Sequence, residues 1–392
     1  MMGNTYGRLF RVTATGESYS GGFRKHLPIP KELYGGLVCI VDGVPPGIKI
    51  TAEIIQAELD KRRPGQTPLD SPRKETDKVY VFSGVMENDL STGAPVALLI
   101  PNVDIEDIHI AQYRSYCDEI RPGHAEYTYF KKYGEFADWV GAGRASGRET
   151  ASRVAGGAVA RQVLDKMGID VVGFVAESHG IKAGPVTYEL AKQNYRKNEI
   201  NCPDLVVAEK MIADVLKVKD AGETSGGVVE IIARGVPAGL GEPVFDKLSA
   251  LLAHGIMSIG AVKGLEFGAG FGVAKMVGSE CNDPAYVDKS TGRVRFKTNN
   301  AGGILGGLSS GEDIRIRVAV KPTPTISVPQ KTVNVKEMKD VVLEPITRRD
   351  PTLLSRIYPV CEAMVRLTLV DALMMAKGYR ALCSFDPKWD KI

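Results

Sequence analysis

Two segments of this 392-residue chain carry a helical pattern that is apolar on almost every side, at 151–167 and 352–377. A helix without a polar face has to be covered all round, so we expect both to be buried against sheets. Strand-like stretches lie before and between them, and consecutive strands are close in the sequence. We therefore predict an α+β fold in which antiparallel sheets pack on a helical layer. No linker rich in proline, serine or charge divides the chain, so we predict a single domain over residues 1–392.

The other elements are predicted from alternation and from capping residues. Thr51 precedes apolar residues at helical spacing, as an N-cap does, and residues 204–217 are expected to form an amphipathic helix. His254 lies at core spacing on an expected helix and is interpreted as structural, and 177–203 is expected to be a variable connection. Alternating apolar and polar residues predict strands at 8–15, 37–42, 79–83, 95–100, 169–176, 227–234 and 314–320.

Charge and composition argue against several classes of protein. Basic and acidic residues are mixed along the chain and give a net charge of +3, unlike the one-sided basic charge of a nucleic-acid-binding protein. There is no apolar run of about 18 residues that would predict a membrane span. The first residues resemble no targeting signal, so we expect a cytoplasmic protein. The six cysteines form no C-x-x-C pair, which is typical of free thiols in a reducing compartment, and we predict no metal site.

The loop before the first apolar helix, GAGRASGRET at 141–150, combines glycines with Arg144 and Arg148. Glycine lets the backbone approach a ligand closely, and a guanidinium presents a permanently charged fork that suits phosphate. The loop leads into a helix N-terminus, which favours anions. An anion site is the functional interpretation, and a solvated loop with two surface arginines is the alternative.

Three further stretches hold groups suited to chemistry. The basic trio 61–63 is either an anion clamp or favourable charge at a helix C-terminus. Between 120 and 134, a Pro-Gly turn separates Arg121 from His124. The glycine-rich segment 299–307 allows a close backbone approach.

Seven short motifs together identify a family. They are DGVPPGI (42–48), KRRPG (61–65), RPGHAEYTY (121–129), GRASGRET (143–150), GVPAGLGEPVFDKL (235–248), AGGILGG (301–307) and KPT (321–323). In this order they resemble chorismate synthases, and the resemblance extends over nearly the whole chain. It implies a single β-α-β sandwich domain with two antiparallel sheets around helices, assembled as a homotetramer.

The resemblance also implies a reaction. Members of the family remove phosphate and a ring proton from 5-enolpyruvylshikimate 3-phosphate to give chorismate, the precursor of aromatic compounds. The reaction needs reduced FMN although no net oxidation occurs. NADPH is the candidate reductant for the flavin, with an external reductant as the alternative.

Site residues follow from the same motifs. His124 matches the family's proton donor to the leaving phosphate, and its ordinarily near-neutral pKa suits a general acid. Asp350 matches the carboxylate that relays the ring proton. The expected substrate-binding residues are Ser18, Arg62, Arg63, Arg121 and Arg148, with Arg348 as a further anion-binding position. The expected FMN-binding residues are Arg144, Ala145, Ser146, Gly260, Ala261, Gly306, Lys321, Pro322, Thr323, Pro324, Thr325 and Arg348.

The first motif of the family is GESH, and this chain differs from it at the last position. Tyr19 stands where the family has a histidine thought to protonate or hold the reduced flavin. A phenol with a pKa of about 10 cannot carry positive charge, although it can donate a hydrogen bond. One hypothesis is that His26, in the insertion that follows, replaces the lost imidazole; another is that Tyr19 serves alone at a reduced rate.

Other departures lie on the same expected site, at Pro68, Gly260, Asn300 and Arg349. Pro68 replaces an arginine linked to reductant or substrate binding, so it leaves the source of electrons open. The departures favour a second hypothesis, a relative that binds FMN or an anion without catalysing the elimination. His124, Asp350 and the set of arginines favour the active enzyme. A general flavin oxidoreductase ranks third, since no dinucleotide fingerprint follows a strand.

Overall fold

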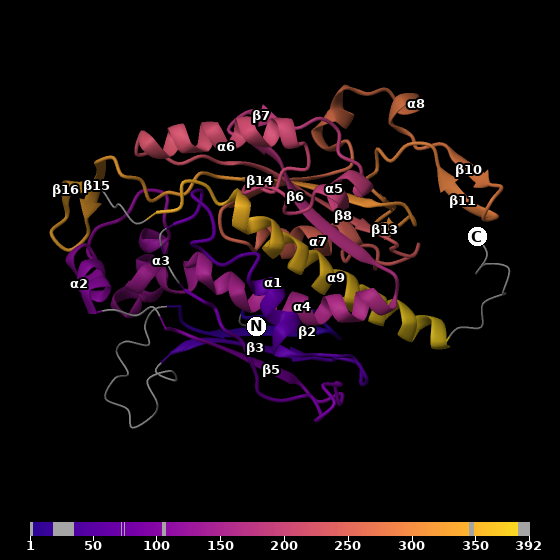
Figure 1. The fold of residues 1–392 in the computed structure, drawn as a ribbon, viewed down its shortest axis with the longest axis horizontal. Helices are drawn as coiled ribbons and strands as arrows, with labels where there is room; N and C mark the ends of the chain where they lie inside the picture. Colours follow the sequence, from indigo (N-terminus) through magenta and orange to yellow (C-terminus); the bar gives the residue numbers. More distant parts are fainter. Residues whose placement is uncertain are drawn as a thin grey trace.

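Two five-stranded sheets enclose a layer of helices (Figure 1). The computed structural model describes residues 3–18, 35–71, 73, 75–103, 107–344 and 349–382. The strand order is β1-β2-β3-β5-β4 in the first sheet and β7-β6-β8-β14-β9 in the second. All neighbouring strands in both sheets run antiparallel. The predicted α+β fold, with antiparallel sheets around a helical layer, is confirmed.

The elements have the following bounds. The first sheet comprises β1 (Thr5–Tyr6), β2 (Arg11–Gly16), β3 (Gly36–Asp42), β4 (Tyr80–Val81) and β5 (Val96–Pro101). The second comprises β6 (Asp170–Ser178), β7 (Ile181–Lys182), β8 (Gly227–Arg234), β9 (Val262–Phe267) and β14 (Ile314–Val320). Helices α1 (Ala52–Leu59), α4 (Thr150–Lys166), α7 (Leu248–Met257) and α9 (Leu354–Leu382) lie between them (Figure 1). The remaining elements are α2 (Asp107–Ser115), α3 (Glu126–Tyr133), α5 (Tyr188–Asn194), α6 (Leu205–Asp220), α8 (Gly278–Cys281) and the hairpins β10–β11 (Ala285–Asp288 and Arg293–Phe296), β12–β13 (Ile304–Leu305 and Leu308–Ser309) and β15–β16 (Gln330–Asn334 and Lys339–Leu343).

Most predicted elements are present, with local differences. Strands β8 and β14 have the predicted bounds. Thr51 and Asp204 cap their helices, accepting hydrogen bonds from backbone N–H groups at 3.2 and 3.1 Å. The strand expected at 79–83 is reduced to the two residues of β4. The interpretation of 177–203 as a connection was incomplete, because it contains β7 and α5, which pack on β6.

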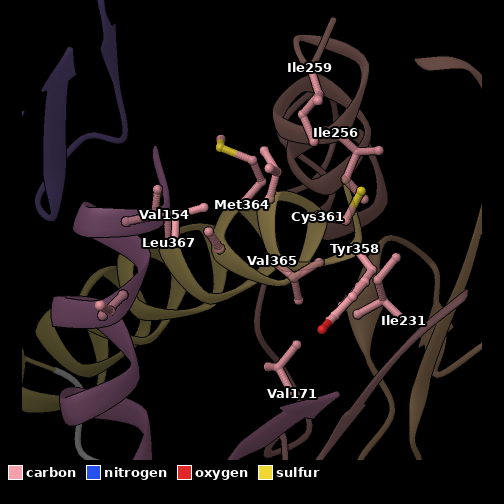
Figure 2. Close-up of a cluster of buried hydrophobic side chains, with 14 of the residues drawn as sticks. Val154, Val171, Ile231, Ile256, Ile259, Tyr358, Cys361, Met364, Val365 and Leu367 are labelled. Atoms are coloured by element: carbon pink, nitrogen blue, oxygen red, sulfur yellow. The ribbon is translucent and has the colours of Figure 1, made fainter. Parts of the chain in front are cut away.

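The two apolar helices, α4 and α9, pack against each other in the middle layer. Figure 2 shows α9 at the centre of the core, with Val154 of α4 on one side and residues of α7, β6 and β8 on the others. Tyr358 and Val365 of α9 are buried there. The burial expected from their all-round apolar pattern is confirmed. Within the described ranges, no helix is long and apolar enough to cross a membrane.

The two helices approach most closely at a glycine. A Cβ added to Gly157 would lie 2.4 Å from the Cβ of Ala363 and 2.6 Å from its Cα. We predict that Gly157→Ala lowers the free energy of unfolding by about 1–2 kcal/mol, because the cost of overpacking exceeds the gain in helix propensity. The measurement is the urea midpoint. Gly184→Ala is the control, since nothing lies within 4 Å of a Cβ there; equal stability of the two variants would contradict the prediction.

A buried ionic group joins α1 to α4 and α9. Glu58 accepts hydrogen bonds from Arg366 at 2.8 Å, from Lys61 at 2.6 Å and from Arg161. Burial alone would raise the pKa of Glu58, but Arg366, Lys61 and Arg161 outweigh it and hold this pKa near 2. The group fixes the end of α1, and therefore the position of Arg62, which follows it.

Candidate active site

A pocket of about 210 Å³ opens where the N-terminal ends of α4 and α9 meet the segment that follows α1. Five arginines and three carboxylates line it, so its charged wall has two more positive than negative groups. This excess favours an anionic ligand. The charged lining residues are Arg62, Arg73, Glu75, Asp77, Arg148, Arg349, Asp350 and Arg356.

The loop before α4 shapes one wall of the pocket. Gly141, Ala142 and Gly143 all have positive φ, and a Cβ at Gly143 would lie 2.8 Å from a backbone oxygen of Asp138. Ser146 accepts a hydrogen bond from the backbone N–H of Arg148 at 3.2 Å and opens a short 3₁₀ turn that runs into α4. The predicted close-approach loop feeding a helix N-terminus is therefore present. Ser146 is the residue that caps this 3₁₀ turn.

Arg62 and Arg148 share one buried carboxylate on the wall of the pocket. Asp77 accepts from Arg62 Nη1 at 2.8 Å and from Arg148 Nε at 3.0 Å. Burial would raise the pKa of Asp77, but the two arginines lower it below its ordinary value. Burial is also the main cause that lowers the pKa of Arg62, to about 10, so Arg62 remains charged at neutral pH. Asp77 thus fixes two predicted substrate-binding arginines side by side.

Asp350, the predicted relay carboxylate, lines the same pocket. Its Oδ1 accepts the backbone N–H of Ser71 at 3.0 Å and forms an ion pair with Arg356. Gly260, a predicted cofactor-binding residue, also lines the pocket, and a Cβ there would meet nothing within 4 Å. Five predicted site residues therefore come together here: Arg62, Ser146, Arg148, Gly260 and Asp350.

His124 belongs to a second cluster, which brings the motif at 121–129 next to the segment that begins with the motif at 321–323. Its Nε2 is hydrogen-bonded to Thr325 Oγ1 at 2.8 Å, and Lys321 Nζ donates to the carbonyl of Gly123 at 2.6 Å. Burial is the main cause that lowers the pKa of His124 to about 3, and Arg121 and Lys321 lower it further. The expectation of a near-neutral pKa was wrong, because it ignored this burial. His124 is therefore neutral at neutral pH in the free protein.

Several predicted arginines have protein partners. Arg144 donates to Glu149 at 2.8 Å and to the carbonyls of Gly16 and Ala14, both at 3.0 Å. It therefore ties the loop to β2 and does not line the pocket, and its predicted role in FMN binding stays a prediction. Arg121 pairs with Glu126. Arg63 pairs with Asp60 at 3.4 Å just after the end of α1.

The remaining predicted residues lie around these clusters or outside them. Ser18 donates to Glu149 at 2.5 Å, and its carbonyl accepts from Arg148 at 3.3 Å. Lys321 donates its backbone N–H to Ala261 at 2.9 Å, which places the two predicted cofactor-binding stretches side by side. The structure places Ala145 in the loop before α4, Gly306 at the β12–β13 turn, and Pro322, Thr323 and Pro324 after β14. Tyr19, His26 and Arg348 lie outside the described residues.

Sequence reasoning missed Arg73, Glu75, Asp77 and Arg356, and it noted Arg349 only as a departure. Asp77 ends a polar loop, where an aspartate gives no sign that it will be buried. Arg356 did carry a signal, because it is a charged residue at the start of an otherwise apolar helix. Arg349 donates to Ser327 and, at 2.7 Å, to the carbonyl of Lys219.

Comparison with known proteins agrees with the motifs. Residues 34–374 match the family model described as chorismate synthase. The chain is 69% identical to a chorismate synthase of Acetivibrio thermocellus over all of both chains. It is 46% identical to one of Methanococcoides burtonii, covering 95% of this chain and 96% of the relative. A crystal structure of a chorismate synthase superposes with a TM-score of 0.71 at 28% identity, covering 95% of this chain and 94% of that one.

Proposed function

Because this chain belongs to the chorismate synthase family, we propose that the arginine-lined pocket is where it binds its substrate. The protein is a carbon–oxygen lyase of the shikimate pathway, which leads to the aromatic amino acids. Its substrate, 5-enolpyruvylshikimate 3-phosphate, carries one phosphate and two carboxylates. The observation that supports the proposal most is the pocket itself, which places five arginines around Asp350.

The residues divide into anion-binding and proton-transferring groups. Arg62 and Arg148, held by Asp77, bind the substrate's anionic groups, with Arg348 as a further cation. A phosphate dianion beside His124 favours its charged form and lets it donate a proton to the leaving phosphate. Asp350 relays the proton that the ring loses onward to water.

The residues around the second cluster fit FMN as the specific cofactor. Thr323 Oγ1 is buried and has no hydrogen-bond partner in the described part of the chain. With Lys321, Gly260 and Ser146, Thr323 would hold the phosphate and ring system of the flavin. Gly306 lies at the β12–β13 turn, near the start of β14 and therefore at the opposite end of that strand from Lys321, so its FMN-binding role stays a prediction. Reduced FMN, when bound, supplies electron density that helps break the carbon–oxygen bond. NADPH is the proposed reductant.

The single domain, homotetrameric state and cytoplasmic location implied by the sequence stay proposals. One surface supports self-association. Val244 and Phe245 are 72% and 91% exposed, and their loop lies beside the β12–β13 turn, whose Leu305 is 43% exposed. Exposed apolar patches of this kind mark interaction sites.

The first motif carries its own prediction. We expect that His26 supplies the lost imidazole, so His26→Ala should lower kcat by about 10²–10⁴-fold, the usual cost of losing a general acid. Tyr19→His should then restore activity to the His26→Ala variant. His179→Ala is the control, because His179 is exposed and paired with Asp214 at 2.9 Å. Full activity of His26→Ala together with a slow Tyr19→Phe would contradict the prediction and assign the role to the phenol.

The second candidate function, binding without elimination, is favoured by the altered residues at positions 19 and 349. Asn300 carries less weight, because its side-chain amide donates to the carbonyls of Glu280 and Cys281 at 3.0 and 3.2 Å and so has a role in the loop. Complementation separates the two functions. The gene should let a bacterial strain without chorismate synthase grow without aromatic supplements, and the Asp350→Asn variant should not. A well-expressed wild-type protein that fails to support growth would favour binding alone.

A further inference from the structure

Arg356 stands at the start of α9 and contacts two parts of the proposed site at once. Its Nη1 forms an ion pair with Asp350 Oδ1, and its Nε donates to the backbone carbonyl of Arg62 at 2.9 Å. Its side chain is only 14% exposed and lines the pocket. One guanidinium therefore connects the proposed proton acceptor to the segment that carries a substrate-binding arginine.

Within the part of the chain that the structure describes, the hydrogen bonds to Asp350 reach only one of its two carboxylate oxygens. In the described ranges, both donors to this carboxylate, the Ser71 N–H and Arg356 Nη1, contact Oδ1. No group in the same ranges donates to Oδ2. The carboxylate is 20% exposed, and Asp350 lines the pocket. Holding one oxygen from two directions fixes the plane of a carboxylate and leaves its other oxygen for a ligand.

We propose that Arg356 is the positioning residue for Asp350: it clamps Oδ1 so that Oδ2 is the atom that receives the ring proton as it is relayed to water. The inference rests on the proposed role of Asp350 and therefore on the proposed function. One proton is taken up at Oδ2 in each turnover, gives a neutral carboxylic acid, and leaves to water. No electron is transferred to or from these residues, and Arg356 keeps its proton throughout.

An arginine suits this role for a geometric reason. Its Nε and Nη1 are held in one rigid plane, so a bond from Nε to the Arg62 carbonyl also sets the direction of the bond to Asp350. A lysine would keep the positive charge but not the two fixed directions. If orientation matters, Arg356→Lys will be impaired, whereas charge alone would leave it active.

The experiment compares Arg356→Lys, Arg356→Gln, Asp350→Asn and the double variant Arg356→Gln/Asp350→Asn. The matched control is Arg196→Gln, which removes an arginine that lines only a neighbouring polar cavity and contacts Gln66 at 3.4 Å. We expect both Arg356 variants to lose about 10–100-fold in kcat with KM changed less than about threefold, as a misplaced catalytic group does. The double variant should be about as slow as Asp350→Asn, because the two residues act as one unit.

A kinetic isotope effect separates positioning from a general structural role. The solvent isotope effect on kcat, measured in D2O, should rise in both Arg356 variants and stay at the wild-type value in Arg196→Gln. Circular dichroism establishes folding, and Arg356→Lys replaces Arg356→Gln if the latter does not fold.

The outcomes distinguish this inference from the function on which it rests. If wild-type protein is active and Asp350→Asn is slow but the Arg356 variants are unchanged, this inference is overturned and the proposed function is not. The inference would also be overturned if the Arg356 variants are slower but have an unchanged isotope effect. The same holds if the losses in kcat from Arg356→Gln and Asp350→Asn add up in the double variant. Wild-type protein without turnover would overturn the proposed function and this inference together.

Discussion

Replacing His124 with alanine is expected to lower kcat by about 10²–10⁴-fold, the usual contribution of a positioned general acid. His124 is held by Thr325 at 2.8 Å and lies beside Arg121 and Lys321, so its ring is oriented but neutral in the free protein. The negative charge of the substrate's phosphate has to favour its protonation. The loss should therefore appear in kcat more than in KM.

Steady-state assays of chorismate formation check this prediction. His179→Ala is again the control, because it removes an exposed imidazole with a surface partner. Burial lowers the pKa of His124 to about 3. If wild type shows an ionisation near pH 6.5 in its plot of kcat/KM against pH, the same ionisation should therefore still be present in His124→Ala. A variant within about threefold of wild type would remove His124 from the mechanism.

Asp77→Asn should be the most destabilising isosteric change in the pocket. It leaves Arg62 and Arg148 buried without their shared countercharge, and breaking a buried pair in this way costs about 3–5 kcal/mol. Asp77 is fully buried, and both arginines are at most 4% exposed. Urea unfolding measures the loss. The control is Asp165→Asn, which removes an exposed partner of Arg161 at 3.6 Å and should cost about 0–1 kcal/mol. Equal midpoints of unfolding in the two variants would refute this account of the pocket.

The same carboxylate makes a pH-dependent prediction. The pKa of Asp77 is lower in the folded protein than its ordinary value of 3.8. A depressed carboxyl pKa contributes stability that is fully present above the unfolded pKa and is lost as pH falls through the folded value. The stability difference between wild type and Asp77→Asn should therefore be constant above about pH 5 and shrink below about pH 4. A difference that does not change with pH would exclude the ion pairs as its cause.

The fold was largely predictable because its core helices have unusual patterns. An apolar helix such as α4 or α9 can only be internal, a polar N-cap marked the start of α1, and the amphipathic pattern after Asp204 indicated α6. The sequence did not predict α5, a short helix with a mostly polar sequence, whose position depends on packing against β6. Strand β4 is short because only Tyr80 and Val81 pair with β5.

The site was predictable in its residue types but not in their directions. Arg148 and Arg144 occur in one motif, yet only Arg148 lines the pocket, whereas Arg144 points to β2. Which way an arginine points depends on partners far away in the sequence. Asp77 was missed for the same reason, because its burial between Arg62 and Arg148 exists only in the folded chain. The error in the pKa of His124 likewise reflects burial, which the sequence motif does not contain.

The most direct measurement is an anaerobic assay of the purified protein with 5-enolpyruvylshikimate 3-phosphate and dithionite-reduced FMN. Chorismate is followed by absorbance, and phosphate is measured in the same samples. We predict equal amounts of both products, turnover that depends on reduced flavin, and loss of turnover in His124→Ala and Asp350→Asn. If folded wild-type protein binds substrate and FMN but releases neither chorismate nor phosphate, the proposed site does not catalyse the elimination.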